Sequence, residues 1–137
     1  MSNLRDNKTT EEWDALEKKY LNKGKTMNTL EFKQHKGQPV MILIHYGFAD
    51  EIGIEEGDEI GFKRGDENEL YIYRLNELGP RFGNGLKISK GQIPTKGYTV
   101  YGTRVANYGQ SGDRFKLTDH KEWDSVNDCE LFEIEKQ

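Results

Sequence analysis

The chain has 137 residues, of which 34 % are hydrophobic and 32 % are charged, and it carries a net charge of −4. These values predict a single soluble globular domain with a modest core. No apolar run approaches the roughly 20 residues of a membrane-spanning helix, and the first residues lack the apolar stretch of a signal peptide. We therefore expect no contact with a membrane. Because Cys129 has no second cysteine to pair with, we expect the protein to be cytoplasmic.

The N-terminal region predicts one amphipathic helix. Residues 1–8 are polar and are expected to be disordered. A capping box, Thr9-x-x-Glu12, predicts a helix over residues 9–24. Its apolar stripe, formed by Trp13, Leu16 and Tyr20, is expected to pack on the rest of the domain. Contact with a partner, or with a second copy in a homodimer, is the alternative.

From Thr29 onward, apolar residues recur with the period of two that is typical of strands. The sequence predicts one mainly-β domain over residues 28–137, a small cradle-loop-like barrel of about eight short strands with the N-terminal helix appended. The fifteen glycines, many at the spacing of turns, favour the same interpretation. The predicted strands cover residues 30–32, 39–48, 59–63, 69–75, 86–89, 98–105, 114–118 and 129–134.

A Gly-Asp motif follows the central apolar strand. Gly53 is expected to close a short helical turn in the left-handed conformation. Gly57 and Asp58 then predict a tight turn, in which Gly57 has a positive φ and the Asp58 side chain binds nearby amides. A second pair, Gly112-Asp113, follows the strand predicted at 98–105. The two motifs favour two pseudo-repeats, residues 28–79 and 85–137, although a chance similarity between hairpins would look the same.

The pattern Ala49-x-x-Ile52-Gly53-Ile54-x-x-Gly57-Asp58-x-Ile60-x-Phe62 resembles the Gly-Asp box of the cradle-loop barrels. That group includes the AbrB/MazE swapped-hairpin transcription factors and the double-psi barrels. The resemblance implies a barrel fold and binding to DNA in transcription regulation. AbrB-type proteins contact DNA through basic residues on the first strand and the turn after it. Residues 44–52 contain no Lys or Arg here, so we do not expect DNA contacts on that surface.

The charges are strongly segregated along the chain. Residues 80–118 carry seven basic side chains and one acidic side chain, whereas residues 49–79 carry three and ten. Cations interleaved with aromatic residues suit phosphate contacts and base stacking. We therefore expect a non-enzymatic DNA-binding transcriptional regulator that uses a basic face within residues 81–116, unless the strands interleave and cancel the charge. The predicted nucleic-acid-binding residues are Arg81, Lys87, Lys90, Lys96, Tyr101, Arg104, Arg114 and Lys116.

The acidic stretches support a different hypothesis. A compact acidic domain can bind a basic groove on a nucleic-acid-processing enzyme and block it, as inhibitors encoded by phages do against host defence or transcription. The partner would then be a basic host protein. The predicted contact residues are Glu51, Glu55, Glu56 and Glu59.

Signatures of catalysis and of metal binding are missing from the sequence. No nucleophile elbow, phosphate-binding loop or dinucleotide fingerprint occurs, so we expect no enzyme activity and no cofactor. His35, His45 and His120 lack metal-ligand spacing, and His45 is expected to be a hydrogen-bonded core residue. Residues 119–128 are predicted to form a solvated acidic loop, although their carboxylates could also gather a divalent cation.

Overall fold

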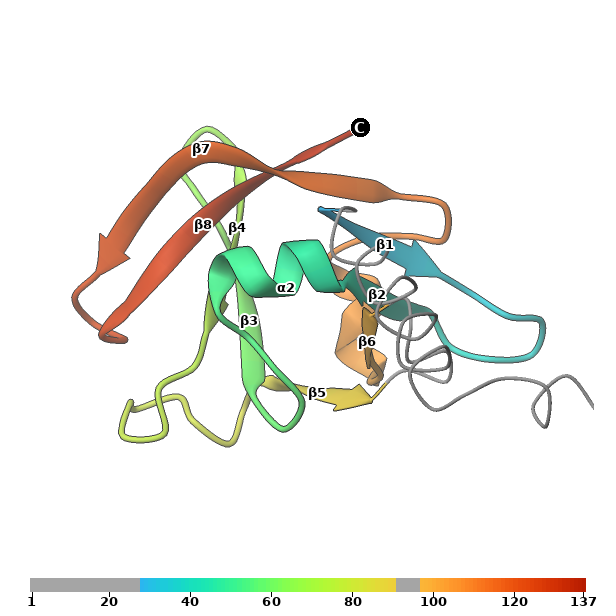
Figure 1. The fold of residues 1–137 in the computed structure, drawn as a ribbon, viewed down its shortest axis with the longest axis horizontal. Coiled ribbons are helices and arrows are strands. Elements are labelled where there is room, and N and C mark those ends of the chain that lie inside the picture. Colours follow the sequence, from blue (N-terminus) through green and yellow to red (C-terminus); the bar gives the residue numbers. More distant parts are fainter. Residues whose placement is uncertain (1–27, 91–96) are drawn as a thin grey trace, which may run out of the picture.

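The computed structural model describes residues 28–90 and 97–137 of the chain. These residues form a closed antiparallel barrel of eight strands (Figure 1), which confirms the prediction of a mainly-β barrel. The helix predicted over 9–24 lies outside the described residues. The elements are β1 (Thr29–Lys33), β2 (Met41–His45), α2 (Tyr46–Ile52), β3 (Glu59–Arg64), β4 (Leu70–Arg74), β5 (Leu86–Lys90), β6 (Gly97–Val100), the 3-10 helix η1 (Thr103–Asn107), β7 (Arg114–Asp124) and β8 (Cys129–Lys136).

The strand order divides the barrel into two matching halves. Around the barrel the order is β1-β2-β6-β5-β3-β4-β8-β7, and β7 pairs back with β1. Exchanging β1–β4 with β5–β8 leaves every pair of neighbours unchanged. The halves meet at four antiparallel pairs, β2 with β6, β5 with β3, β4 with β8 and β7 with β1. Each half therefore needs the other to cover its apolar face.

The core follows from the alternation of side chains along each strand. Ile42 and Ile44 of β2 face the interior of the barrel and are fully buried. The helix α2 adds Phe48, Ala49 and Ile52 to the same cluster, at the i, i+1 and i+4 spacing of one helical face. A smaller cluster lies on the opposite face of β4 and β8 and consists of Tyr71, Tyr73, Leu75, Cys129 and Leu131.

Both Gly-Asp pairs form the same turn. In the first turn Gly57 has a φ of 93°, and Asp58 Oδ2 accepts a hydrogen bond from the Glu55 amide at 2.9 Å. In the second turn Gly112 has a φ of 96°, and Asp113 Oδ2 accepts from the Gln110 amide at 3.0 Å. The positive φ predicted for Gly57 is confirmed. Such a φ is easily adopted by glycine alone.

Each turn is also anchored to a strand in the same way. The Gly57 amide donates to the Ile88 carbonyl at 2.9 Å, and the Ile88 amide donates to the Asp58 carbonyl at 2.8 Å. In the second turn the Gly112 amide donates to the Phe32 carbonyl at 2.9 Å, and the Phe32 amide donates to the Asp113 carbonyl at 2.8 Å. Phe32 of β1 and Ile88 of β5 therefore occupy equivalent positions in the two halves.

Two of the predicted strands end earlier than the sequence suggests. The strand predicted at 39–48 ends at His45, because Phe48 and Ala49 reach the core from α2. As predicted, Gly53 closes this helix in the left-handed conformation, with a φ of 74°. The strand predicted at 98–105 ends at Val100, because Gly102 has a φ of 150° and turns the chain into η1. Apolar composition alone does not distinguish a buried helical turn from a buried strand.

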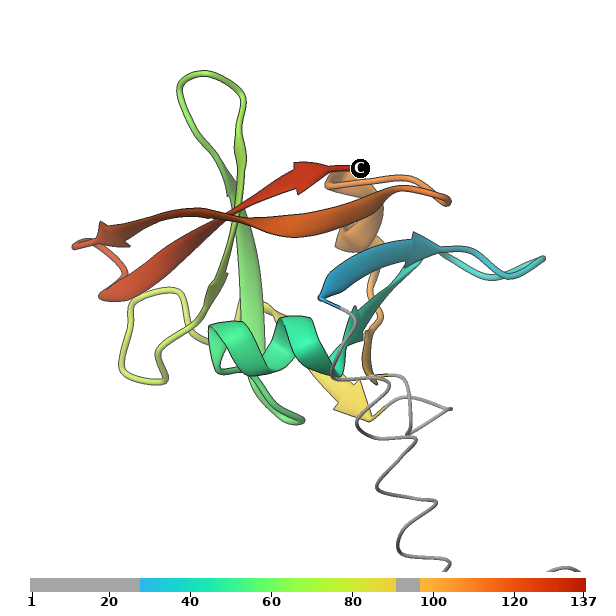
Figure 2. The ribbon, with the colours of Figure 1, turned by 45° about the horizontal axis from the view of Figure 1, so that its top comes forward.

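The prediction of an acidic loop over residues 119–128 was wrong for most of that range. Strand β7 continues through Asp119 to Asp124 and pairs with β8, with a register shift between Leu117 and Lys121. The two long strands extend beyond the barrel as a twisted ribbon (Figure 2). The sequence from Asp119 to Asp124 shows no alternation of apolar and polar residues, because most of the ribbon is exposed and both of its faces can carry charged side chains.

Candidate functional site

The loop between β4 and β5 is fixed by a carboxylate of β3. Glu59 accepts hydrogen bonds from the amides of Gly83 and Gly85, each at 3.2 Å. A Cβ atom on Gly85 would lie about 3.0 Å from atoms of Glu59 and Ile60 and 2.9 Å from Leu75, so the loop packs closely on the barrel. Glu59, predicted as a contact for a basic partner, therefore holds the loop that carries Arg81.

Two of the predicted arginines meet at this loop. Arg81 from the loop and Arg104 from η1 both line a pocket of about 190 Å³, together with Tyr73, Asn84 and Tyr108. The Arg104 Nη2 atom donates to the Gly85 carbonyl at 3.1 Å. Burial raises the pKa of the Tyr73 hydroxyl, although the hydrogen bond and charge of Arg81 oppose this. Both guanidinium groups belong to exposed residues, so each keeps N–H donors for a ligand.

The aromatic walls of this pocket are positioned by the barrel. The Tyr108 ring lies 4.8 Å from the Phe62 ring, centroid to centroid. Tyr73 lies across Gly61, where a Cβ atom would come within 2.5 Å of the tyrosine ring. Any other residue at Gly61 would displace Tyr73 and alter the wall of the pocket.

Lys87 and Tyr101 extend the site along the outside of the barrel. β5 and β6 are antiparallel and Ile88 pairs with Val100, so Lys87 near the start of β5 and Tyr101 just after β6 lie at the same end of this strand pair, and both are exposed. Tyr101 is 50 % exposed, and Phe82 in the neighbouring loop is 44 % exposed. We call Arg81, Phe82, Lys87, Tyr101 and Arg104 the basic site.

The remaining predicted cations do not belong to the basic site. Lys90 lies at the far end of β5, opposite Tyr98, and Lys96 lies outside the described residues. Arg114 and Lys116 lie on β7, which is separated from β5 by three strands in either direction around the barrel. The predicted continuous basic face is therefore divided, because β5 and β7 lie on opposite sides of the barrel although only β6 separates them in sequence.

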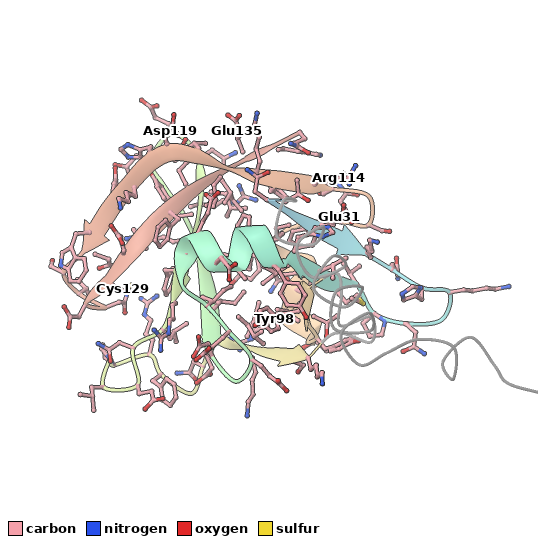
Figure 3. All side chains as sticks on the ribbon, viewed as in Figure 1. Glu31, Tyr98, Arg114, Asp119, Cys129 and Glu135 are labelled. Carbon is pink, nitrogen blue, oxygen red and sulfur yellow. The ribbon has the colours of Figure 1, made fainter. Side chains whose placement is uncertain are left out.

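Arg114 is bound to a buried carboxylate. It donates to Glu31 through both Nη2 and Nε, the latter at 2.9 Å, and Figure 3 shows the two side chains together. Lys33 Nζ and His45 Nε2 lie 3.3 and 3.4 Å from the same carboxylate. Burial raises the pKa of Glu31, but the hydrogen bond from Arg114 and the surrounding positive charges outweigh this and lower it.

Most other cations of the described residues are also paired with carboxylates. Lys116 lies 3.5 Å from Glu135, and Lys121 lies 3.2 Å from Glu130. Lys136 lies 2.9 Å from Asp113. By contrast, Arg81, Lys87, Lys90 and Arg104 form no ion pair in the part of the chain that the structure describes, and neither do Lys36 and Arg64. Unpaired cations are thus concentrated in the segment 81–104.

The predicted acidic contacts gather at another place. Glu55 and Glu56 are exposed in the first Gly-Asp turn, and Glu51 is exposed at the end of α2. The Tyr98 and Tyr46 rings meet edge to face nearby, with centroids 5.1 Å apart. Burial raises the pKa of Tyr98, and Tyr46 and the acidic side chains of this region raise it further. Tyr98 lies beside α2 in Figure 3.

His45, His120 and Cys129 lie in different environments. His45 is 4 % exposed, as expected of a core residue, yet neither ring nitrogen makes a hydrogen bond of good geometry. His120 lies on the exposed ribbon and contacts Glu122 at 2.9 Å, and this hydrogen bond raises its pKa. Burial raises the pKa of the Cys129 thiol. No group of three or more potential metal ligands comes together within residues 28–90 and 97–137.

Several residues of the site were missed in the sequence. Tyr73, Asn84 and Tyr108 come from three separate segments, and no spacing in the sequence links them to Arg81. Phe82, Asn84 and Tyr108 lie within the predicted segment 81–116 but were not among the predicted contact residues, whereas Tyr73 lies outside that segment. Outside the site, the exposure of the apolar residues Leu78, Trp123 and Val126 was not predicted either.

Comparison with known proteins adds no relative from which a function could be taken. No protein-family model, curated protein or solved structure matches the chain. Among the described helices, none has the length and apolar character needed to cross a membrane.

Proposed function

We propose that the chain is a non-enzymatic DNA-binding protein, as a transcriptional regulator of AbrB-like build would be, and that it binds through the basic site. The observation that supports this most is the absence of carboxylate partners for Arg81, Lys87 and Arg104 within the described residues. A protein with a net charge of −4 has acidic side chains in excess. Cations that stay unpaired in such a protein are available for phosphate groups.

The basic site is organised for this task. Glu59 fixes the loop of Arg81, and the Gly85 carbonyl holds Arg104. Side chains held in place lose little conformational entropy when a ligand binds. Phosphate contacts by lysine and arginine release counterions from DNA, so affinity must fall steeply as salt is raised.

Binding of a labelled 20-base-pair duplex, measured by fluorescence anisotropy at several salt concentrations, tests the proposal. Each of Arg81→Gln, Lys87→Gln and Arg104→Gln should weaken binding and reduce the salt slope by about one unit. Lys116→Gln and Lys121→Gln remove the same charge from ion-paired positions and should have much smaller effects. Equal effects of both groups of variants, or no binding at low salt, would refute the proposal.

The second candidate function is inhibition of a nucleic-acid-processing enzyme by an acidic surface. It is favoured by the exposure of Glu51, Glu55 and Glu56, none of which forms an ion pair within the described residues. Glu59 no longer belongs to this set, because its carboxylate binds the loop amides. Reversing Glu55 and Glu56 to Lys should then slow association with a basic partner, mainly at low salt. The same variant should not weaken DNA binding if the first proposal is right.

We also propose that the barrel is of the cradle-loop type. The two Gly-Asp turns support this, since both have the same φ and the same hydrogen bonds to a strand. A solved structure of a relative with matching turns, strand order and helix positions would test it. A relative that lacks the second turn would oppose it.

A further inference from the structure

We infer that the natural ligand of the basic site is single-stranded nucleic acid, with a phosphate group seated between Arg81 and Arg104 and bases stacked on Phe82 and Tyr101. This inference rests on the proposed function and names the form of nucleic acid that the site accepts. It follows from the kinds of side chain exposed there and from the shape of the site.

The first argument is the exposure of two aromatic rings among cations. Aromatic side chains usually pack in cores, as Phe32 and Phe62 do here. Phe82 and Tyr101 instead expose 44 % and 50 % of their surface, and Phe82 adjoins Arg81 in the chain while Tyr101 follows β6 at the end of the strand pair where Lys87 lies. An aromatic face near cations is the arrangement with which proteins stack unpaired bases, since every base offers a π-face. In a duplex those faces are covered by neighbouring base pairs.

The second argument is the shape of the pocket. Its volume of about 190 Å³ lies between the loop 81–85 and η1, with an arginine from each. A concave site of this kind suits one protruding group better than the regular backbone of a rigid duplex. A flexible single strand can place one phosphate in the pocket and turn the adjacent bases outward onto the exposed rings.

The third argument is that the basic site, as far as the described residues form it, contains no element that reads a duplex. A major groove admits a helix or a two-stranded ribbon that carries side chains to the base edges. The basic site consists of a loop, one outer strand position and a five-residue 3-10 helix. The lysines of the exposed β7–β8 ribbon are paired with carboxylates, so the ribbon offers no comparable positive surface.

Anisotropy with three probes tests the inference: fluorescein-labelled dT20, the 20-base-pair duplex and an RNA 20-mer of uridines. The dT20 or uridine probe should bind at least about tenfold more tightly than the duplex. Tyr101→Leu and Phe82→Leu keep apolar bulk but remove the ring, and each should weaken dT20 binding by about 5- to 150-fold. Neither variant should change duplex binding. Competition with inorganic phosphate shows whether a phosphate alone fills the pocket, and dT20 should remain bound at millimolar phosphate.

The outcomes separate this inference from the proposed function. If Arg104→Gln weakens duplex and single strand equally and the two leucine variants bind dT20 normally, DNA binding stands but the single-strand inference is overturned. Tighter binding of the duplex overturns it as well. If no probe binds, both fail. Thermal unfolding of each variant confirms that it is folded, and Lys116→Gln is the matched control for loss of a charge.

Discussion

Two equivalent strand pairs that join the halves of the barrel have opposite charge arrangements. In one pair, Glu31 of β1 lies opposite Arg114 of β7, and the two side chains bind each other. In the other, Lys87 of β5 lies opposite Glu59 of β3. Their equivalence follows from the Gly-Asp turns, which contact Phe32 next to Glu31 and Ile88 next to Lys87.

The second pair forms no ion pair among the described contacts. Glu59 turns to the amides of Gly83 and Gly85 instead, and Lys87 remains exposed. The carboxylate at one seam therefore stabilises the barrel, whereas the one at the other seam stabilises a loop. The comparison explains how a repeated framework can leave cations unpaired on one side of an acidic protein.

The helices of the two halves should differ most in their contribution to stability. Phe48 of α2 and Val105 of η1 are both fully buried. Phe48→Ala should lower the free energy of unfolding by about 3–5 kcal/mol, because it leaves a large cavity. Val105→Ala removes less volume and should cost about 2 kcal/mol. Urea denaturation measures both, and equal losses would show that the shorter helix is as important to the core as α2.

The two Gly-Asp turns should respond alike. Gly57→Val and Gly112→Val each force a branched residue into a positive φ and should each cost about 1–3 kcal/mol. Glu56→Val and Ser111→Val place the same side chain one residue earlier, where φ is not positive, and should change stability by no more than about 0.5 kcal/mol. A difference of more than about 1 kcal/mol between the glycine variants would contradict the equivalence of the turns.

The two seam carboxylates should differ in their sensitivity to acid. The pKa of Glu31 is lowered in the folded state, so its ionised form adds stability above its usual pKa, and this contribution is lost as the pH falls through the folded value. Glu31→Gln should cost about 1 kcal/mol near pH 7 and nothing once the carboxylate is protonated. Thermal unfolding from pH 7 to pH 3 measures this. A constant difference across that range would mean that the effect of the substitution is steric.

The barrel could be predicted from the sequence because the local patterns, apolar alternation and turn glycines, match the way the strands pack in the fold. Alternating apolar residues gave the strands, and Gly57 and Gly112 gave the turns that connect them. The predicted ends of β2 and β6 were too late, because Phe48 and Val105 are buried residues of helices and not of strands. Periodicity over three or four residues does not distinguish the two cases. Likewise, the exposed part of β7 has no buried face to produce a pattern.

The candidate site was predictable only in part. Few acidic residues occur in the segment that contains Arg81, Lys87, Tyr101 and Arg104. The three cations among these residues also lack carboxylate partners in the described part of the folded chain. Arg114 belongs to the same segment, but its pairing with Glu31 spans 83 positions of sequence and cannot be inferred from composition. The strand order decides which charges meet, and no local pattern encodes it.

The pairing of β1 with β7 also has a consequence for the synthesis of the protein. Thr29 pairs with Lys116, so the barrel cannot close until most of the chain has been translated. Until then β1 and β2 can form a hairpin, but its inner face stays exposed to water. Contacts between such distant residues slow folding and prolong the exposure of apolar surface. We therefore expect this chain to complete its fold after leaving the ribosome, and truncated products to aggregate.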